Sequence, residues 1–314
     1  MRWAADFGRR FIVFVDVEEE FDWFAPLDRA QRATTAMRAF PAAHRRFVEA
    51  GVGLTCMVDY PIATDPDAVA VLRDVAADGR SAIGAQLHPW VNPPHDEAVR
   101  PFASFPGNLP RALQAAKLAA LNDAIDAAFG SRPLAFRAGR YGLGPDSWAL
   151  LAAAGYRLDS SVRARYSYAA QGGPDYAAIG PGAFRAGGLI ELPLTTVFTG
   201  ALRGGGAGLY RALGMLPRAR GAAARAGLLQ RVALTPEDMP IGAALAAVDA
   251  ALAAGVELLA FSFHSPSLEP GHTPYVRNAA GLAAFWRWWA AMLDRLAARG
   301  VRAASLAEVL AAAG

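Results

Sequence analysis

The sequence predicts an α/β fold, a distorted (β/α) barrel of about seven parallel strands. Two observations support this prediction. Short apolar runs rich in β-branched and aromatic residues alternate with longer alanine-rich stretches, a pattern that favours a parallel sheet with right-handed crossovers. In addition, 54% of the 314 residues are hydrophobic and 19% are charged, so the chain can bury a barrel-sized core without a metal or a disulfide. We expect a single domain over 1–314, because no repeat or linker-like segment interrupts it.

The expected strands are apolar runs bounded by Gly, Pro or Asp. They cover 11–17, 52–60, 81–88, 133–139, 156–161, 189–194 and 257–264. Helices are expected over 28–50, 67–78, 109–129, 144–154, 241–254 and 279–299. Five glycines stand where such a helix can end in the left-handed conformation: Gly51, Gly130, Gly155, Gly255 and Gly300. The only cysteine, Cys56, lies in an apolar run, so we expect it to be buried and exclude a disulfide framework.

Composition narrows the choice of partners. The most apolar tracts, 241–263 and 279–298, are interrupted by charged residues, and the N-terminal apolar run is too short for a signal peptide. We therefore expect a soluble, cytoplasmic protein. The net charge of +3 is weak evidence for nucleic-acid binding, since arginine and alanine are abundant and Lys117 is the only lysine among 31 basic residues. We expect no nucleic-acid partner.

One segment, 202–236, is strongly basic and is expected to be a helical insertion. It contains six arginines and no acidic residue before Glu237. Arg211, Arg218 and Arg225 recur every seven residues, which would keep them near one face of a helix. The segment is either a lid or membrane-surface element that recruits a lipid- or nucleotide-linked anionic substrate, or a plain pair of surface helices.

Polar residues capable of ligation or proton transfer stand at the end of almost every expected strand. In β/α barrels the carboxyl ends of the strands form one rim, where the chemistry takes place. The residues concerned are Asp16, Glu18, Asp59, Gln86, His88, Arg137, Asp159, Glu191 and His264. We therefore expect the active site on this rim.

Ordered motifs in these segments resemble the polysaccharide deacetylases, the carbohydrate esterase family 4 enzymes with a NodB homology domain. They are FVDVEEEFDW (14–23), IGAQLHPWVNPP (83–94), FRAGRYG (136–142), LDSS (158–161), ELPLT (191–195) and FSFHSPSLEPGHTPY (261–275). The resemblance spans about 11–276, most of the chain. It implies a distorted barrel that uses a divalent metal, often zinc, to remove N-acetyl groups from amino sugars.

The resemblance also implies a metal site. Asp16 is similar to the catalytic base of the first motif and Glu18 to its metal ligand, whereas Glu19 and Asp22 are expected to be solvated. The second motif departs from the family, because Gln86 replaces the first of two ligand histidines and only His88 remains. An amide oxygen is a poor zinc ligand, so the expected centre of Glu18, His88 and Gln86 is incomplete unless water or His95 contributes.

The remaining motifs imply the other roles. Arg137 matches the arginine that orients the base, although Gly139 stands where the family has proline, and Asp159 is expected to brace Arg137 or the catalytic histidine. His264 matches the general acid that protonates the leaving amine. We expect substrate contacts from Trp90, Arg140, Tyr141 and His272.

The sequence therefore predicts a metal-assisted deacetylase of an N-acylated amino sugar in a glycan or a glycan precursor, acting as an amide hydrolase. Two alternatives stay open. Loss of a ligand at Gln86 is what a non-catalytic carbohydrate-binding barrel would show. A glycoside hydrolase would need Asp16 or Glu18 to face Glu191 across about 5–10 Å.

Overall fold

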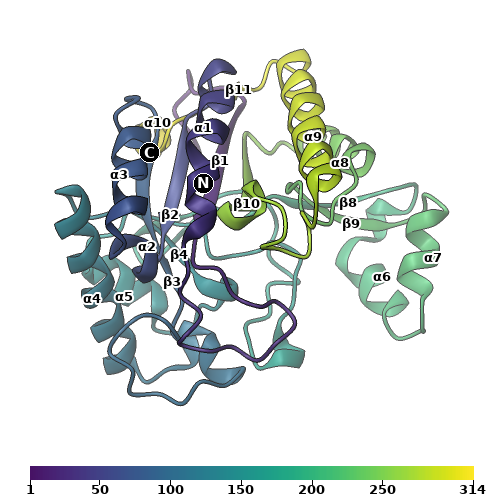
Figure 1. Ribbon diagram of the computed structural model, residues 1–314. Helices are drawn as coiled ribbons and strands as arrows, with labels where there is room; N and C mark the ends of the chain where they lie inside the picture. Colours follow the sequence, from purple (N-terminus) through teal and green to yellow (C-terminus); the bar gives the residue numbers. More distant parts are fainter.

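A computed structural model describes all residues, 1–314, and its centre is a curled sheet of nine strands (Figure 1). Eight strands lie side by side in the order β10, β1, β2, β3, β4, β5, β7, β6, and β11 pairs with β1. Their bounds are Leu258–His264, Arg10–Val17, Leu54–Val58, Ala82–Leu87, Ala135–Ala138, Leu158–Asp159, Leu189–Glu191, Phe184–Ala186 and Arg302–Ala303. Every pairing is parallel except that of β6 with β7. The predicted fold class is confirmed.

The sheet curls until its two sides almost meet, and single backbone hydrogen bonds cross the gap. The Thr195 N–H, just after β7, donates to the Ala260 carbonyl in β10, 3.1 Å away. The Leu234 N–H donates to the Thr195 carbonyl at 2.9 Å, and the Ser262 N–H donates to the Leu234 carbonyl at 3.3 Å. The barrel is therefore closed by an irregular seam instead of a continuous strand ladder.

The seven predicted strands correspond to β1, β2, β3, β4, β5, β7 and β10. The helices are α1 (Phe40–Glu49), α2 (Tyr60–Ala63), α3 (Pro66–Ala76), α4 (Arg111–Phe129), α5 (Ser147–Ala153), α6 (Gly206–Leu213), α7 (Ala219–Arg225), α8 (Ile241–Ala253), α9 (Ala279–Ala298) and α10 (Leu306–Ala312). The first predicted helix began too early, because 28–34 form a loop before α1. None of the helices is both long enough and apolar enough to cross a lipid bilayer.

Alternation along β1 separates two cores and positions the rim. Side chains of alternate residues point to opposite faces of a strand. Val13 and Val15 join the larger core between the sheet and the outer helices. Ile12 and Phe14 join a smaller core inside the barrel, to which α10 contributes. Asp16 follows in the inward register, so the apolar barrel interior ends at a charged rim.

The predicted basic insertion forms an arm, residues 196–233, that projects from the barrel (Figure 1). Strands β8 (Thr196–Thr199) and β9 (Gln230–Ala233) pair antiparallel and carry α6 and α7 between them. The expectation that Arg211, Arg218 and Arg225 share one helix face is wrong. Arg211 lies in α6, Arg225 lies in α7, and Arg218 precedes α7 with a positive φ of 61°.

Candidate active site

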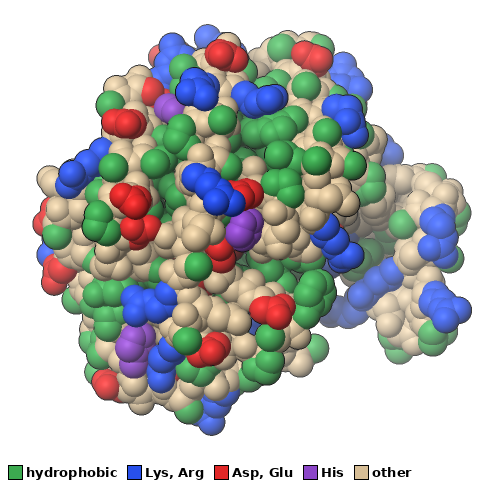
Figure 2. All heavy atoms as spheres, in the orientation of Figure 1, with side chains coloured by type: hydrophobic (Ala, Val, Ile, Leu, Met, Phe, Trp, Pro, Cys, Tyr) green, Lys and Arg blue, Asp and Glu red, His purple; other side chains and the backbone are tan.

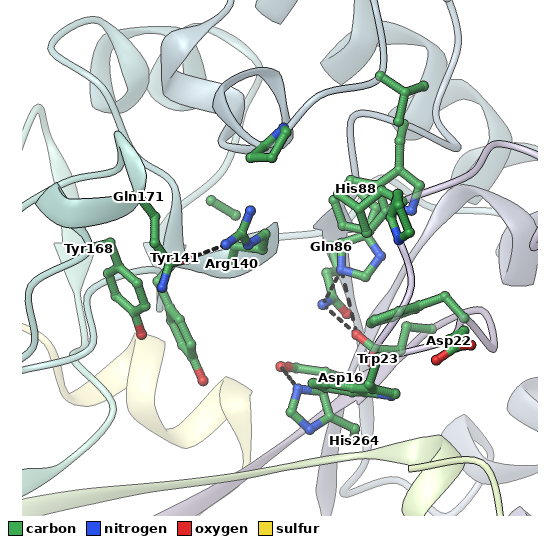
Figure 3. Close-up of a pocket in the computed structure, with 18 of the residues that line it drawn as sticks. Asp16, Asp22, Trp23, Gln86, His88, Arg140, Tyr141, Tyr168, Gln171 and His264 are labelled. Atoms are coloured by element: carbon green, nitrogen blue, oxygen red, sulfur yellow. Dashed lines mark hydrogen bonds and ion pairs between the residues drawn. The ribbon is translucent and has the colours of Figure 1, made fainter. Parts of the chain in front are cut away.

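The carboxyl rim surrounds a cavity of about 670 Å³. Strand register brings the predicted residues together, because Asp16 lies beside His264 and Gln86 lies beside Arg137 in neighbouring strands. Figure 3 shows Asp16, Gln86, His88 and His264 directed toward one space, with Arg140, Tyr141 and Tyr168 across from them. Six of the nine predicted strand-end residues thus line the cavity, whereas Asp59, Asp159 and Glu191 do not.

Arg137 holds the carboxylate of Asp16. Its side chain is 1% exposed, and its Nη1 lies 2.6 Å from Asp16 Oδ1. The same nitrogen donates to Ser262 Oγ, while Nε donates to the Ser160 carbonyl at 3.1 Å. A guanidinium with a fixed fork of donors suits this task. The predicted contact between Arg137 and Asp16 is present.

Glu237 holds the imidazole of His264. The Nδ1–H donates to Glu237 Oε2 at 2.7 Å, which leaves Nε2 facing Asp16 Oδ2 at 3.8 Å. Burial alone would lower the pKa of His264, but the carboxylates around it, Glu237 first, outweigh that effect and raise the pKa to about 10. The histidine carries a proton at neutral pH and directs the opposite nitrogen into the cavity.

Asp159 does not brace Arg137 or His264, contrary to the expectation. Its Oδ1 accepts from the Ser161 N–H at 3.1 Å, and its Oδ2 accepts from Trp148 Nε1 at 3.1 Å. Trp148 Nε1 also donates to Glu191 Oε2 at 3.0 Å. Both carboxyl groups are fully buried and neither lines the cavity. Both instead contact Trp148, which lies in α5.

His88 is fixed by a carboxylate that the sequence analysis placed in solvent. Glu19 is fully buried, which corrects that expectation. Its Oε2 accepts from His88 Nδ1 at 2.8 Å, and its Oε1 accepts from Trp90 Nε1 at 2.9 Å. Trp90 also stacks on the His88 ring at 4.4 Å. Hydrogen bonding at Nδ1 leaves His88 Nε2 directed toward the cavity.

His88 Nε2 meets two further side chains at the cavity wall. The Gln86 amide nitrogen lies 3.1 Å from it and donates to Glu18 Oε2 at 3.0 Å. Glu18 Oε1 and Gln86 Oε1 are buried without any hydrogen-bond partner. Burial raises the pKa of Glu18 to about 7, although His264 and His88 oppose the shift. A carboxylate, an amide and an imidazole thus adjoin at the cavity wall, and two of their oxygens lack a partner, which are donor types that a divalent cation can bind.

A second group of potential ligands lies behind His88. One ligand atom from each of Glu19, Asp59 and His88 falls within 4.8 Å of the others, so this buried group can hold a metal ion. Its oxygens already have partners, however. Asp59 accepts from the Glu19 N–H at 2.9 Å and from the Ile62 N–H at 3.0 Å. Burial raises the pKa of Glu19 to about 8 and raises that of Asp59 as well.

Gly139 and the two residues after it shape the opposite wall. A Cβ on Gly139 would come within 2.5 Å of the His88 ring, so the glycine makes room for that histidine. Arg140 and Tyr141 follow with φ of 53° and 59°, a left-handed backbone that is strained for residues with a side chain. Both side chains line the cavity.

Two other histidines lie away from the cavity. His272, expected at the substrate, contacts Glu20 with its Nδ1 at 3.1 Å and lines an adjoining surface hollow instead. His95 is exposed and does not line the cavity, so it does not replace the missing histidine.

Lys117 supports the loop that follows His88, and the sequence analysis gave it no role. Its side chain is fully buried in α4. The ammonium donates to the carbonyls of Pro89, Asn92 and Pro94 at 2.9, 2.6 and 2.7 Å, and lies 3.1 Å from Glu97. Lys117 is the only lysine in the sequence, and this fact alone could have marked it as a residue with a special role. Glu237, which the sequence marks only as the first acidic residue after the basic segment, carries no comparable signal.

These features define the class of protein by fold: a distorted (β/α) barrel with a polar carboxyl rim. The sequence matches no known family profile and no curated protein. Among solved structures, the chain is similar to a protein of Mycobacterium smegmatis assigned as a polysaccharide deacetylase, with a TM-score of 0.53 and 18% identity over 99% of this chain and 92% of that one.

Two further structures are similar at the level of the fold. One, from Pseudomonas aeruginosa, is also assigned as a polysaccharide deacetylase, with a TM-score of 0.50, 13% identity and coverage of 96% of this chain and 88% of that one. The other is an α-amylase from Thermotoga maritima, with a TM-score of 0.50, 10% identity and coverage of 98% and 75%. At these identities the likeness establishes the barrel alone.

Proposed function

We propose that the protein is a metal-assisted deacetylase that hydrolyses the amide of an N-acylated amino sugar in a glycan or a glycan precursor. One observation carries the proposal. A carboxylate held by arginine, an imidazole held by glutamate, and the orphaned oxygens of Glu18 and Gln86 beside His88 all face one cavity. The similar structures assigned as polysaccharide deacetylases share the barrel and support this choice.

Glu18, Gln86 and His88 would hold the cation. A half-turn of the Gln86 amide about its last torsion exchanges nitrogen and oxygen, and this torsion is soft and nearly two-fold. The exchange would present the oxygen where the nitrogen now lies, 3.1 Å from His88 Nε2. A bound divalent ion, for which zinc is our choice, supplies Lewis acidity toward the acyl carbonyl and water.

The chain's own residues supply the proton transfers. Asp16, with Oδ1 occupied by Arg137, has Oδ2 available to accept a proton from the attacking water. His264 Nε2 lies 3.8 Å from that oxygen and donates a proton to the nitrogen as the C–N bond breaks. Glu237 accepts from Nδ1–H and so keeps the imidazolium in the orientation that this donation needs. Asp16 is thus the base and His264 the acid.

Metal binding by the parent and by two variants tests the centre. Calorimetric zinc titration should show weak or moderate binding in the parent and tighter binding in Gln86→His, because imidazole is a better zinc ligand than an amide. His88→Ala should not bind. Tighter binding in the parent than in Gln86→His would give Gln86 a native role as a ligand.

Activity tests the chemistry separately. Acetate release from a panel of N-acetylated amino sugars should be lost in His264→Ala while circular dichroism stays native. If neither the parent nor Gln86→His binds any divalent metal and the parent releases no acetate, a non-catalytic carbohydrate-binding barrel is the better account. A two-carboxylate glycoside hydrolase is disfavoured because Glu191 is fully buried and does not line the cavity.

A further inference from the structure

The basic arm, residues 196–233, carries positive charge that nothing in the protein neutralises. None of its residues is acidic. Every ion pair that an arginine forms in this structure involves an arginine outside the arm. Five of the six arm arginines are exposed: Arg203, Arg211, Arg218, Arg220 and Arg225. Such a concentration of unpaired charge attracts a polyanionic partner.

The same arm exposes apolar side chains at the turn between α6 and α7. Met215 is 82% exposed and Leu216 is 63% exposed. Together with Leu202 and Leu228 they make four of the nine large hydrophobic side chains that are exposed in the protein, although the arm has only 38 of the 314 residues. Figure 2 shows this part of the surface as blue and green spheres. Apolar residues are thus concentrated where the protein projects furthest.

A stack of arginines and tyrosines joins the arm to the cavity wall. The Arg231 guanidinium lies over the rings of Tyr210 at 4.9 Å and Tyr166 at 3.4 Å. Arg163 then lies over Tyr166 at 3.9 Å and over Tyr141 at 5.5 Å, and both Arg163 and Tyr141 line the cavity. Planar cations are attracted to aromatic faces. These contacts connect the base of the arm to residues of the cavity wall.

We propose that the arm docks the protein on an anionic membrane surface, with Met215 and Leu216 entering the headgroup boundary and the arginines facing lipid phosphates. Apolar side chains beside basic ones are the composition of elements that lie in the membrane interface. A nucleic acid would account for the arginines but not for the exposed apolar turn. Docking through the arm would hold the cavity near the membrane surface, where a lipid-linked substrate is presented.

Vesicle flotation with the full chain tests this proposal. The parent should float with phosphatidylglycerol-containing vesicles at low salt, float less at high salt, and bind pure phosphatidylcholine vesicles weakly. The triple variant Arg211→Ser, Arg218→Ser, Arg225→Ser should bind roughly 100-fold more weakly. The double variant Met215→Ser, Leu216→Ser, which keeps every charge, should bind about tenfold more weakly.

A charge-matched control separates the arm from general electrostatics. Arg9, Arg45 and Arg287 are exposed and form no ion pair, and replacing all three by serine gives the same net charge as the arm variant. This control should keep at least half of the parent's binding. Equal losses in the two triple variants, or no flotation of the parent, would overturn the proposal. Arm-dependent binding of RNA without binding of anionic vesicles would overturn it in favour of a nucleic-acid partner. Thermal melting confirms that each variant is folded.

Discussion

The cavity rim and the basic arm use charge in opposite ways. On the rim, Asp16, Arg137 and Glu237 are buried and each has a named partner at hydrogen-bonding distance. On the arm, five arginines are exposed and none has a carboxylate partner. Desolvated charges are costly unless paired, whereas exposed charges are free to meet a partner from outside. The rim charges are therefore held in fixed positions, whereas the arm charges remain free to contact a partner from outside.

The largest effect should come from neutralising the base on the rim. Asp16→Asn keeps the shape of the side chain but cannot accept the proton, so the turnover number on an acetylated amino sugar should fall about 10²–10⁴-fold. The matched control is Asp74→Asn, because Asp74 is exposed on α3. A steady-state assay compares them, and equal activity of the two variants would remove Asp16 from the mechanism.

Loss of a buried cation should cost more stability than loss of an exposed one in the same helix. Lys117→Met leaves three carbonyls without their donor and Glu97 with only Arg29 as a counter-charge, so the free energy of unfolding should fall by about 3–5 kcal/mol. Arg111→Met, also in α4, breaks only an exposed pair with Asp146 and should cost below about 1 kcal/mol. Urea denaturation measures both. Similar losses of stability in the two variants would contradict the difference between buried and exposed charges.

Removing the carboxylate behind His88 should weaken metal binding without touching the cavity. In Glu19→Gln the amide cannot accept from both His88 Nδ1 and Trp90 Nε1, so zinc affinity should fall about 10–100-fold. Glu49→Gln, at the exposed end of α1, serves as the control. Calorimetry reports both affinities, and an unchanged value in Glu19→Gln would mean that Glu19 does not orient the ligand.

The smallest effect concerns the buried carboxyl pair. Burial raises the pKa of Asp159 above its ordinary 3.8 and that of Glu191 well above 4.5, with Asp159 adding negative charge next to Glu191. A raised pKa means that the folded protein binds the proton more tightly, so this contribution to stability is present at acid pH. It is lost as the pH rises through the folded pKa, by up to about 1.4 kcal/mol per pH unit for one proton.

Glu191→Gln removes that titration. Between pH 5 and pH 9, chosen to lie above the ordinary value of 4.5, the parent's melting temperature should fall relative to that of the variant. Differential scanning calorimetry at several pH values measures the two curves. Parallel curves would show that the pair does not titrate in this range.

The sequence predicts which residues lie on the rim, because the geometry of a parallel sheet sets their positions. Alternation along β1 and the common end of parallel strands bring Asp16, Gln86, Arg137 and His264 together, whatever the loops do. The partners of these residues were not predictable. Glu237 reaches His264 from a loop before α8, and Glu19 reaches His88 from the segment after β1, where strand alternation no longer sets side-chain direction.

The arm shows where residue spacing in the sequence fails to predict the structure. The charge and the apolar content of the arm can be predicted from the sequence. The heptad spacing of Arg211, Arg218 and Arg225, however, suggested one continuous helix face. Pro217 and the left-handed backbone of Arg218 separate α6 from α7 instead. Spacing predicts a shared face only where one helix spans all the positions. Outside the arm, the strands β6 and β11, which are two or three residues long, were missed, as were the short helices α2 and α10.

The burial of Lys117 also has a chemical consequence. It is the only lysine in the sequence and its side chain has no exposure to solvent, so reagents and enzymes that acylate lysine find no accessible side-chain amine on the folded protein. The accessible positive charge of the surface therefore belongs to arginine and the histidines, and arginine stays protonated at every physiological pH. Acetylation, which discharges lysine-rich surfaces, has no target here, and the charge of the arm is permanent.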